Sequence, residues 1–288
     1  MVIGTNIRTY FNGKWHEGDI PVMRAADHGI WQGSSIFDGA RFFDGVAPDL
    51  ANHCARANRS AKALMITPTV GDDEMVAIVR EGLRAYGPSQ AVYIRPMYWA
   101  LDGSDLGVAP KEGSTGFAIS LEQVPMPSFD NATTLTRTQF RRPVLEDNVC
   151  NAKAGCLYPN NARMLVEAKS KGFANALVAD AMGNVAETAT ANVFMVKDGV
   201  AYTPIPNGTF LSGITRARHI ANLRADGVEV VETVLTFDDF HGADEVFLSG
   251  NFAKVTPVKA FDDTAYETGP VTRRAWQLYM DWAHSDGN

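Results

Sequence analysis

Two-residue turn sequences limit the folds open to this chain. Asn12-Gly13, Asp44-Gly45 and Asp198-Gly199 each lie between short runs of strand-forming residues. Asn-Gly and Asp-Gly favour the tight turn in which both residues adopt positive φ, and this turn joins neighbouring antiparallel strands. Parallel neighbours need a crossover of about a dozen or more residues instead. The sequence therefore predicts sheets that contain several hairpins.

Helical and extended patterns alternate along the rest of the chain. Apolar residues recur at helical spacing over 50–64, and 72–86 opens with acids and closes on Gly87, so both stretches are predicted helices. Residues 91–101 predict a strand, in which Pro96 favours a sheet edge or a bulge. The same patterns predict strands at 115–122, 134–140, 191–197, 200–203, 228–231, 245–249 and 254–258, and helices at 160–171, 214–225 and 273–283. These elements predict an α+β or mixed α/β fold rather than a doubly wound parallel sheet.

Turn-forming residues cluster near the middle of the chain. They are Pro125, Pro127, Ser128, Asp130 and Asn131. Such a cluster between structured segments predicts an interdomain linker, which we place at 123–132. We expect an N-terminal α/β domain at 1–122 and a C-terminal domain at 133–288, a division that suits a chain of 288 residues.

Composition and charge argue against several classes of function. Lys and Arg number 26 against 33 Asp and Glu, a formal charge of −7, and no basic stripe indicates nucleic acid. No apolar run approaches the roughly 20 residues of a membrane helix, and the start of the chain lacks the features of a secretory signal. We therefore expect a cytoplasmic protein. The 3 cysteines and 6 histidines are scattered, so we expect neither a disulfide framework nor a metal site.

A lysine set among small residues is the first candidate for chemistry. Lys153 lies within Asn151-Ala152-Lys153-Ala154-Gly155, and Tyr158 follows five positions after the lysine. Small neighbours leave room for a bulky group on the amine, and partial desolvation makes an amine nucleophilic. A solvated surface lysine is the ordinary alternative.

Three further segments carry residues suited to binding an anion or a polar ring. Glu187 enters a run of small and hydroxyl residues, where a solvated strand end is the ordinary alternative. Ser212-Gly213 opens a helix with Thr215 in its first turn, so backbone N–H groups and a hydroxyl can converge on an anion, although the same residues suit simple capping. Ser249-Gly250-Asn251 reads as a tight turn between two strands.

In this order and spacing the four segments resemble the class IV aminotransferases. This is the fold type IV family of pyridoxal-phosphate (PLP) enzymes, typified by branched-chain amino acid aminotransferase. The similarity extends from Tyr10–Gly13 to Gly269–Thr272. It implies a two-domain fold like that of D-amino acid aminotransferase, PLP as cofactor, and ping-pong transfer of an amino group between an L-amino acid and a 2-oxo acid.

The resemblance also implies roles for individual residues. Lys153 would form the Schiff base with PLP, Tyr158 would lie near the ring oxygen, and Glu187 would face the pyridine nitrogen. That carboxylate would keep the nitrogen protonated, so that the ring accepts electrons when the substrate Cα–H bond breaks. The groups implied for the phosphate are the backbone of Ile214 and Thr215, the Thr215 hydroxyl, Arg56 and Asn251.

The same resemblance implies a substrate-binding surface. Tyr93 and Arg95 share one face of the predicted strand and resemble the family's Tyr-x-Arg strand, which contacts substrate carboxylates. Gly107-Val108 resembles the loop that a partner subunit contributes, so a homodimer with the active site at the subunit interface is implied. Gln32 and Phe252 complete the implied substrate-binding set.

Some positions differ from the branched-chain pattern, so alternatives stay open. Gln32 stands where that group usually has a tyrosine, and Asn251-Phe252 stands where a threonine and a small residue are usual. We favour a transaminase for branched-chain or other apolar L-amino acids. The alternatives are a transaminase for (R)-amines or D-amino acids, an aminodeoxychorismate lyase, and a non-catalytic small-ligand-binding protein. The aromatic residues that fit a pocket and a core equally well are Trp31, Tyr98, Trp99 and Phe252.

Overall fold

The computed structural model describes residues 4–285, which divide into two compact units. Within that range, unit 1 comprises 4–126 and Ala152–Leu157, and unit 2 comprises Pro127–Asn151 and Tyr158–Ser285. The first change of unit, between Met126 and Pro127, falls within the stretch expected to be a linker. The segment Ala152–Leu157, which carries Lys153, belongs to unit 1 although it follows that stretch in the sequence.

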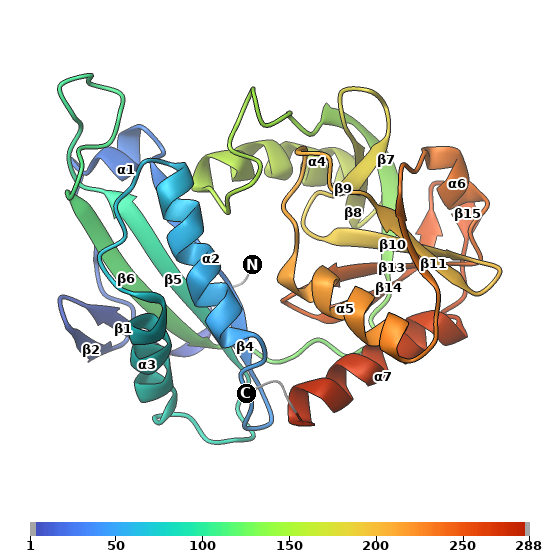
Figure 1. Cartoon of the computed structure of the whole chain (residues 1–288), viewed down its shortest axis with the longest axis horizontal. Coiled ribbons are helices and arrows are strands. Elements are labelled where there is room, and N and C mark those ends of the chain that lie inside the picture. The colour runs from blue at the N-terminus through green and yellow to red at the C-terminus, as the bar shows by residue number, and fades with distance from the viewer. Residues whose placement is uncertain (1–3, 286–288) are drawn as a thin grey trace. The chain divides into compact units, whose positions relative to one another are not determined.

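Unit 1 is built on an antiparallel sheet of six strands (Figure 1). Its strands are β1 (Thr5–Phe11), β2 (Lys14–Glu17), β3 (Ser35–Phe37), β4 (Ala40–Phe42), β5 (Val92–Ala100) and β6 (Thr115–Gln123). Their order is β2-β1-β6-β5-β3, and β4 also pairs with β5. Helices α2 (Leu50–Ala63) and α3 (Asp72–Leu83) cover one face of this sheet, and the short helix α1 (His28–Trp31) precedes β3. Helix α2 buries an apolar stripe that includes Cys54, Ala57 and Ala61, as its spacing predicts.

The predicted hairpins are confirmed by their backbone angles. Asn12 and Gly13 have φ of 51° and 79° and join β1 to β2. Asp44 and Gly45 have φ of 49° and 82°, and they close a bridge between Phe43 and Val46. Asp198-Gly199 forms the same kind of turn between two strands of unit 2. Because both φ values are positive in each turn, the neighbouring strands are antiparallel, as expected.

The edge position expected from Pro96 is wrong, because β5 is an interior strand. It pairs with β6 along its full length and with β3 and β4 on the other side. The carbonyl oxygen of Pro96 accepts a hydrogen bond from Asp38 N, between the end of β3 and the start of β4. The missing N–H of Pro96 therefore faces the interruption between two short strands, where no ladder bond is lost.

Unit 2 contains a mixed sheet of nine strands. They are β7 (Thr133–Arg141), β8 (Asn175–Ala179), β9 (Val185–Thr188), β10 (Asn192–Lys197), β11 (Val200–Pro204), β12 (Val230–Thr233), β13 (Glu245–Gly250), β14 (Lys254–Phe261) and β15 (Thr264–Ala265). Their order is β12-β11-β10-β13-β14-β7-β8-β9, and β15 pairs with β14. Three pairs are parallel, namely β11 with β12, β14 with β7, and β7 with β8. The mixed architecture predicted from the sequence is confirmed.

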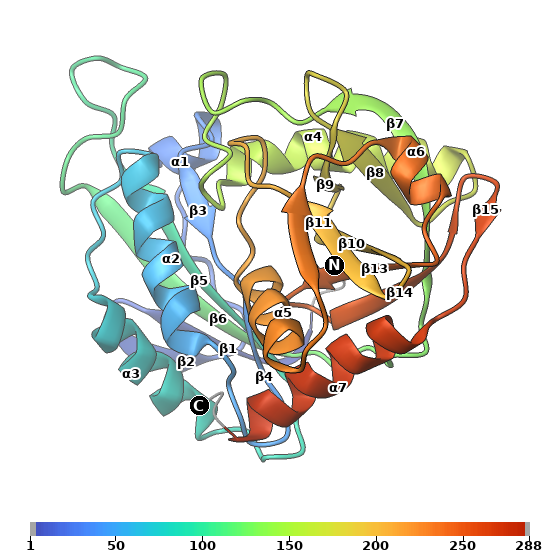
Figure 2. The same ribbon diagram turned by 45° about the vertical axis from the view of Figure 1, so that its right-hand side comes forward.

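Helices cover the sheet of unit 2. They are α4 (Tyr158–Ser170), which follows a 3₁₀ turn at Gly155–Leu157, α5 (Ile214–Ala225), α6 (Phe237–His241) and α7 (Pro270–Ser285). Figure 2 shows α5 and α7 side by side, and both contact β13. Their apolar faces meet Phe194 and Phe247, whose rings are stacked with centroids 4.8 Å apart. No helix in the described part of the chain is both long enough and apolar enough to cross a membrane.

Several predicted boundaries of unit 2 shift by one to three residues. The strand expected at 228–231 is found at Val230–Thr233, after Gly227 with φ of 86°. The turn expected at Ser249-Gly250-Asn251 lies slightly later, because Gly250 still pairs with Lys254. The connection is therefore Asn251-Phe252-Ala253, and this places Asn251 at its first position.

Candidate functional site

The lysine segment is fixed within unit 1 by backbone hydrogen bonds. Lys153 N donates to Ser60 Oγ of α2 at 3.1 Å, and Phe37 N of β3 donates to the Lys153 carbonyl at 3.2 Å. Ala154 forms an antiparallel bridge with Ile36. The half-buried amine of Lys153 lies 4.9 Å from the centroid of the Phe37 ring. Its main chain is therefore anchored on both sides while the long side chain extends over an aromatic face.

Glycine is required beside this lysine by a close approach. A Cβ atom at Gly155 would lie 2.7 Å from Ser35 Oγ and 3.3 Å from the Ser35 carbonyl oxygen. Cys156, which follows, is a free and exposed thiol. The small residues noticed in the sequence thus allow the segment to pack closely along β3.

Arg56 is held by a buried ion pair on the neighbouring helix. Its Nε and Nη2 donate to the two carboxylate oxygens of Asp38 at 2.6 and 2.8 Å, and His53 Nδ1 lies 2.7 Å from Asp38 Oδ1. Burial alone would raise the pKa of Asp38, but the Arg56 guanidinium and His53 outweigh it and hold that pKa well below its ordinary value. The guanidinium for which the family resemblance implies phosphate binding therefore has a fixed orientation.

A cavity of about 220 Å³ lies in unit 1 beside β3 and β5. Its lining residues are Val22, Met23, Ser35, Ile36, Phe37, Arg95, Met97, Tyr98 and Trp99. Phe37 pairs with Met97, so both side chains and Arg95 share one face of the sheet. The amine of Lys153, which lies over Phe37, is on this same face. Lys153 and Arg95 are thus brought to one face of unit 1.

Tyr93 and Arg95 share a face, as the sequence predicts. The Arg95 guanidinium lies 5.2 Å from the centroid of the Tyr93 ring and forms an ion pair with Glu122 of β6. A Cβ atom at Gly39 would lie 2.1 Å from the Tyr93 hydroxyl oxygen, so a larger residue at this position would displace the Tyr93 ring. Tyr93 is buried, whereas Arg95 is partly exposed and reaches the cavity.

Gln32 and the Gly107-Val108 loop are linked through His28. Gln32 ends α1, and its backbone N–H donates to the His28 carbonyl. The His28 ring lies 2.6 Å from Ser34 Oγ through Nδ1 and 3.4 Å from the Gly107 carbonyl oxygen through Nε2. Gln32, Gly107 and Val108 are all exposed, and the exposed fraction of Val108 is 72%.

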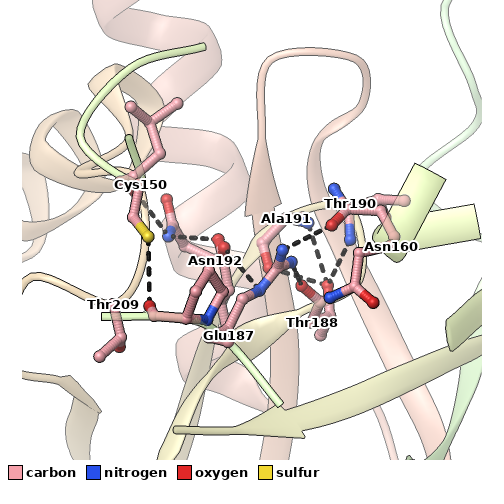
Figure 3. A network of polar contacts seen from close by, with 12 residues as sticks. Cys150, Asn160, Glu187, Thr188, Thr190, Ala191, Asn192 and Thr209 are labelled. Atoms are coloured by element: carbon pink, nitrogen blue, oxygen red, sulfur yellow. Dashed lines mark hydrogen bonds and ion pairs between the residues drawn. The ribbon is translucent and has the colours of Figure 1, made fainter. Parts of the chain in front are cut away.

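Glu187 is the centre of a polar network in unit 2 (Figure 3). Its Oε1 lies 3.1 Å from Arg142 Nε, and its Oε2 accepts a hydrogen bond from Asn192 Nδ2 at 3.2 Å. The buried Arg142 also donates to Asn161 Oδ1 at 2.6 Å and to the Thr188 carbonyl at 2.7 Å. Glu187 is therefore not a solvated strand end but a carboxylate with a fixed orientation.

Asn192 connects this carboxylate to the start of α5. The same Nδ2 group donates to the Leu211 carbonyl at 3.1 Å, and a Cβ atom at Gly213 would lie 2.1 Å from Asn192 Oδ1. A side chain at position 213, directly before α5, would therefore force Asn192 to shift. Thr215, in the first turn of α5, is buried. The third predicted segment therefore lies beside the second.

The Asn251 turn also belongs to this group. Asn192 and Ser249 are paired across β10 and β13, and a Cβ atom at Gly250 would lie 3.3 Å from Ala191 Cβ. Lys254, whose exposed fraction is 1%, donates from Nζ to Asn251 Oδ1 at 2.6 Å. This contact sets the orientation of the amide group, whose Nδ2 is buried without a hydrogen-bond partner among the described residues.

The structure thus brings the predicted residues together in two groups. Unit 1 holds Lys153, Arg56, Tyr93, Arg95, Gln32, Gly107 and Val108, and unit 2 holds Glu187, Ile214, Thr215, Asn251, Phe252 and Tyr158. Tyr158 begins α4 and is exposed, as is Phe252. Of the aromatic residues that fit a pocket or a core, Tyr98 and Trp99 are buried and Trp31 is exposed.

Sequence reasoning missed the residues that orient the predicted ones. These are Ser60, Glu122, Arg142, Asn192 and Lys254. Each acts on a residue distant in sequence or through a turn, and only Arg142, in an Arg-Arg-Pro run that ends a strand, carries a local signal. A charged residue directed inward at a strand end is a sign of a buried ion pair.

Comparisons with known proteins find matches over most of this chain. The family model described as amino-transferase class IV matches residues 35–261. The branched-chain-amino-acid aminotransferase of Salmonella typhimurium is 31% identical over 287 residues, covering 94% of this chain and 91% of that protein. The crystal structure of an aminotransferase from Brucella abortus bound to PLP is 55% identical, with a TM-score of 0.95 over 97% of this chain and 99% of that one. The branched-chain amino acid aminotransferase from Escherichia coli has a TM-score of 0.87 at 29% identity, covering 97% and 95% of the two chains.

Proposed function

Because the chain belongs to the class IV aminotransferase family, we propose that it transfers an amino group between an apolar or branched-chain L-amino acid and a 2-oxo acid. Membership of the family confirms the expected fold type IV architecture, the aminotransferase activity and PLP as cofactor. When bound, the cofactor supplies a ring that accepts the electron pair released as the substrate Cα–H bond breaks.

The observation that carries the proposal is the fixed carboxylate of Glu187. A carboxylate that faces the cofactor's ring nitrogen keeps a proton on that nitrogen and makes the ring a better electron acceptor. The ion pair with Arg142 and the hydrogen bond from Asn192 keep Glu187 oriented without help from solvent. We propose that the Glu187 carboxylate keeps this proton on the ring nitrogen.

The residues proposed for the phosphate also suit an anion. Ile214 and Thr215 begin a helix of 12 residues, whose first N–H groups carry partial positive charge. Asn251 Nδ2 is a buried donor without an acceptor among the described residues, and burying such a donor costs about 1–3 kcal/mol unless a ligand accepts its hydrogen bond. We propose that these groups and the Arg56 guanidinium bind the phosphate.

Lys153 is proposed to bind the cofactor and to move the proton. Anchored through its backbone to Ser60 and Phe37, it would move the proton between the substrate Cα and the cofactor's C4′ atom, with its amine on the cavity face of the sheet. Tyr158 is proposed to donate to the cofactor's ring oxygen.

The cavity of unit 1 supports an apolar substrate side chain. Apart from Ser35 and Arg95, its lining consists of aliphatic, methionine and aromatic residues. Burial of a leucine-sized side chain in such a lining is worth about 1.5–3 kcal/mol. We propose that this cavity receives the side chain, while Tyr93, Gln32 and Phe252 contribute further contacts.

We also infer a cytoplasmic homodimer in which the partner completes each active site. The support is the loop that carries Gly107 and Val108, where Leu106 and Val108 have exposed fractions of 80% and 72%. Large apolar side chains exposed on one loop are typical of a protein interface. Sedimentation analysis of the protein should give twice the chain mass of 31.3 kDa.

The test is the visible absorbance of the PLP-loaded protein before and after L-leucine is added without any 2-oxo acid. We expect L-leucine to convert the cofactor band to that of the pyridoxamine form, and Lys153→Ala should abolish this conversion. If L-leucine, L-valine and L-isoleucine leave the band unchanged while D-alanine or (R)-1-phenylethylamine converts it, the stereochemical part of the proposal is wrong. Release of pyruvate from aminodeoxychorismate would instead identify a lyase.

A further inference from the structure

Lys254 combines deep burial with a backbone conformation that lysine rarely adopts. Its exposed fraction is 1%, and its φ of 66° lies in the left-handed region. It follows the short connection Asn251-Phe252-Ala253 and pairs with Gly250, and glycine is the usual residue where a hairpin loop ends with positive φ. Lysine is almost never fully buried without a partner. A lysine kept in this strained and buried position indicates that its side chain has a function.

The Lys254 ammonium group determines the orientation of the Asn251 amide. Its Nζ donates to Asn251 Oδ1 at 2.6 Å and lies 5.2 Å from the centroid of the buried Tyr279 ring. An ammonium group only donates hydrogen bonds, whereas an amide has one accepting and one donating end. The accepting end of Asn251 therefore faces Lys254, and the donating Nδ2 faces away from it. This Nδ2 is buried and has no hydrogen-bond partner among the described residues.

The backbone of Lys254 is joined to helix α5. His219 Nε2 donates to the Lys254 carbonyl oxygen at 3.2 Å, because a carbonyl oxygen only accepts. Burial lowers the pKa of His219 to about 4, so the ring is neutral at neutral pH. Thr215 precedes His219 by four residues and therefore lies on the same face of α5. The turn that presents Asn251 is thus connected to the helix whose first turn carries Thr215.

We propose that Lys254 is a positioning residue for the cofactor's phosphate, which holds the Asn251 amide in the one orientation that directs Nδ2 toward a phosphate oxygen. The inference rests on the proposed function, since that function assigns Asn251 to the phosphate. If the amide turned over, Oδ1 would face the negatively charged phosphate, and two acceptors cannot form a hydrogen bond. A donor whose orientation is already fixed loses little conformational entropy when the cofactor binds.

The test compares the affinities of the full-length protein for PLP and for pyridoxal, which lacks the phosphate, before and after Lys254→Met. Methionine has a similar length and suits a buried site, but it cannot donate a hydrogen bond to Asn251. We expect the affinity for PLP to fall at least about tenfold, equivalent to ~1.4 kcal/mol, and that for pyridoxal to change less than about twofold. A merely structural role would lower both affinities together. Such an equal fall, or an unchanged affinity for PLP, would overturn the proposal.

Asn251→Ala separates the orientation of the amide from simple attraction between charges. Loss of the Lys254 charge would weaken phosphate binding whatever residue stands at 251, whereas a lysine that acts through the amide has nothing to orient once Asn251 is alanine. In the Asn251→Ala background we therefore expect Lys254→Met to change the affinity for PLP less than about twofold. Losses that simply add in the double variant contradict the proposal. Lys259→Met removes the same charge from an exposed site on β14, and it should leave both affinities unchanged.

A second variant leaves the buried lysine in place and so covers a Lys254→Met protein that does not fold. Asn251→Asp keeps an oxygen for Lys254 Nζ but puts a second oxygen where Nδ2 was. We expect its affinity for PLP to fall at least about tenfold while that for pyridoxal is retained, and an unchanged affinity for PLP would show that Nδ2 does not face the phosphate. Failure of the proposed function has a different signature, because the protein then binds PLP but L-leucine gives no half-reaction.

Discussion

Replacing Asp38 by asparagine tests the buried ion pair that orients Arg56. The side chain of Asp38 is fully buried, and it accepts hydrogen bonds from Arg56, from His53 and from the backbone N–H of Gly39. Asparagine preserves the shape but removes the negative charge. The Arg56 guanidinium, whose side chain is 9% exposed, then has no opposing charge at this contact.

The expected destabilisation follows from the burial of both partners. Removing one member of a buried ion pair costs about 3–5 kcal/mol, because the remaining charge is left uncompensated. Unit 1 should therefore lose this amount, and amide protection of α2, which carries Arg56, should fall with it. The protein's affinity for PLP should fall as well, since the guanidinium no longer has a fixed orientation.

The pH dependence of stability provides a second test of the Asp38–Arg56 ion pair. Because the folded-state pKa of Asp38 lies below its ordinary value of 3.8, the unfolded chain binds the proton first as the pH falls. The contribution of Asp38 is thus complete above about pH 4 and is lost progressively below it. In Asp38→Asn this part of the acid sensitivity should be absent.

The assay is urea unfolding combined with hydrogen-exchange mass spectrometry on α2. The matched control is Glu17→Gln, which removes an ion pair with Arg8 at an exposed site, where the Glu17 side chain is 81% exposed. This control should not differ measurably from the unmodified protein. If Asp38→Asn lowers the stability of unit 1 by less than about 1 kcal/mol, the buried pair does not have the role assigned to it.

Two other predictions concern unit 2. Burial lowers the pKa of His219 to about 4, so between pH 6.5 and pH 4 the unfolded chain binds a proton that the folded chain does not. Stability should therefore decline by up to about 3 kcal/mol over this interval, and His219→Gln, followed by urea unfolding at several pH values, should remove that decline. Gly213→Ala places a Cβ atom 2.1 Å from Asn192 Oδ1, so Asn192 must shift and its hydrogen bond to Glu187 is disturbed, and PLP affinity measured by fluorescence titration should drop about tenfold. Gly242→Ala, whose Cβ atom would have 3.6 Å to its nearest neighbours, should leave that affinity unchanged.

Local sequence signals predicted the elements whose ends are determined locally. The bounds of α5 match the expected 214–225, because Gly213 precedes its first turn and Gly227 follows its last. The hairpins match for the same reason, since an Asn-Gly or Asp-Gly pair needs no distant partner to favour its turn. The short elements α1 and β3 were missed, because three or four residues carry no measurable period.

Site residues could be predicted where the residue type itself indicates the chemistry. The residues that orient them by packing could not be predicted. Lys153 and Glu187 stand out by residue type within a run of small neighbours. Nothing in the sequence shows that Ser60, 93 residues away, accepts the hydrogen bond from the lysine backbone. Glu122 escapes for a similar reason, because a strand pattern does not reveal the register that places Glu122 opposite Tyr93 and within reach of Arg95.

The return of 152–157 to unit 1 has a consequence for the order of synthesis. Residues 4–126 leave the ribosome before the segment that bridges Ile36 and accepts the hydrogen bond from Phe37. At translation rates of about 5–20 residues per second, the 31 residues from Pro127 to Leu157 follow within roughly two to six seconds. Until then strand β3 lacks the neighbouring segment 152–157. The segment 152–157, which bears the Lys153 amine, thus completes the N-terminal unit. A chain cut at 126 would lack both the amine and the contacts that this segment makes with β3.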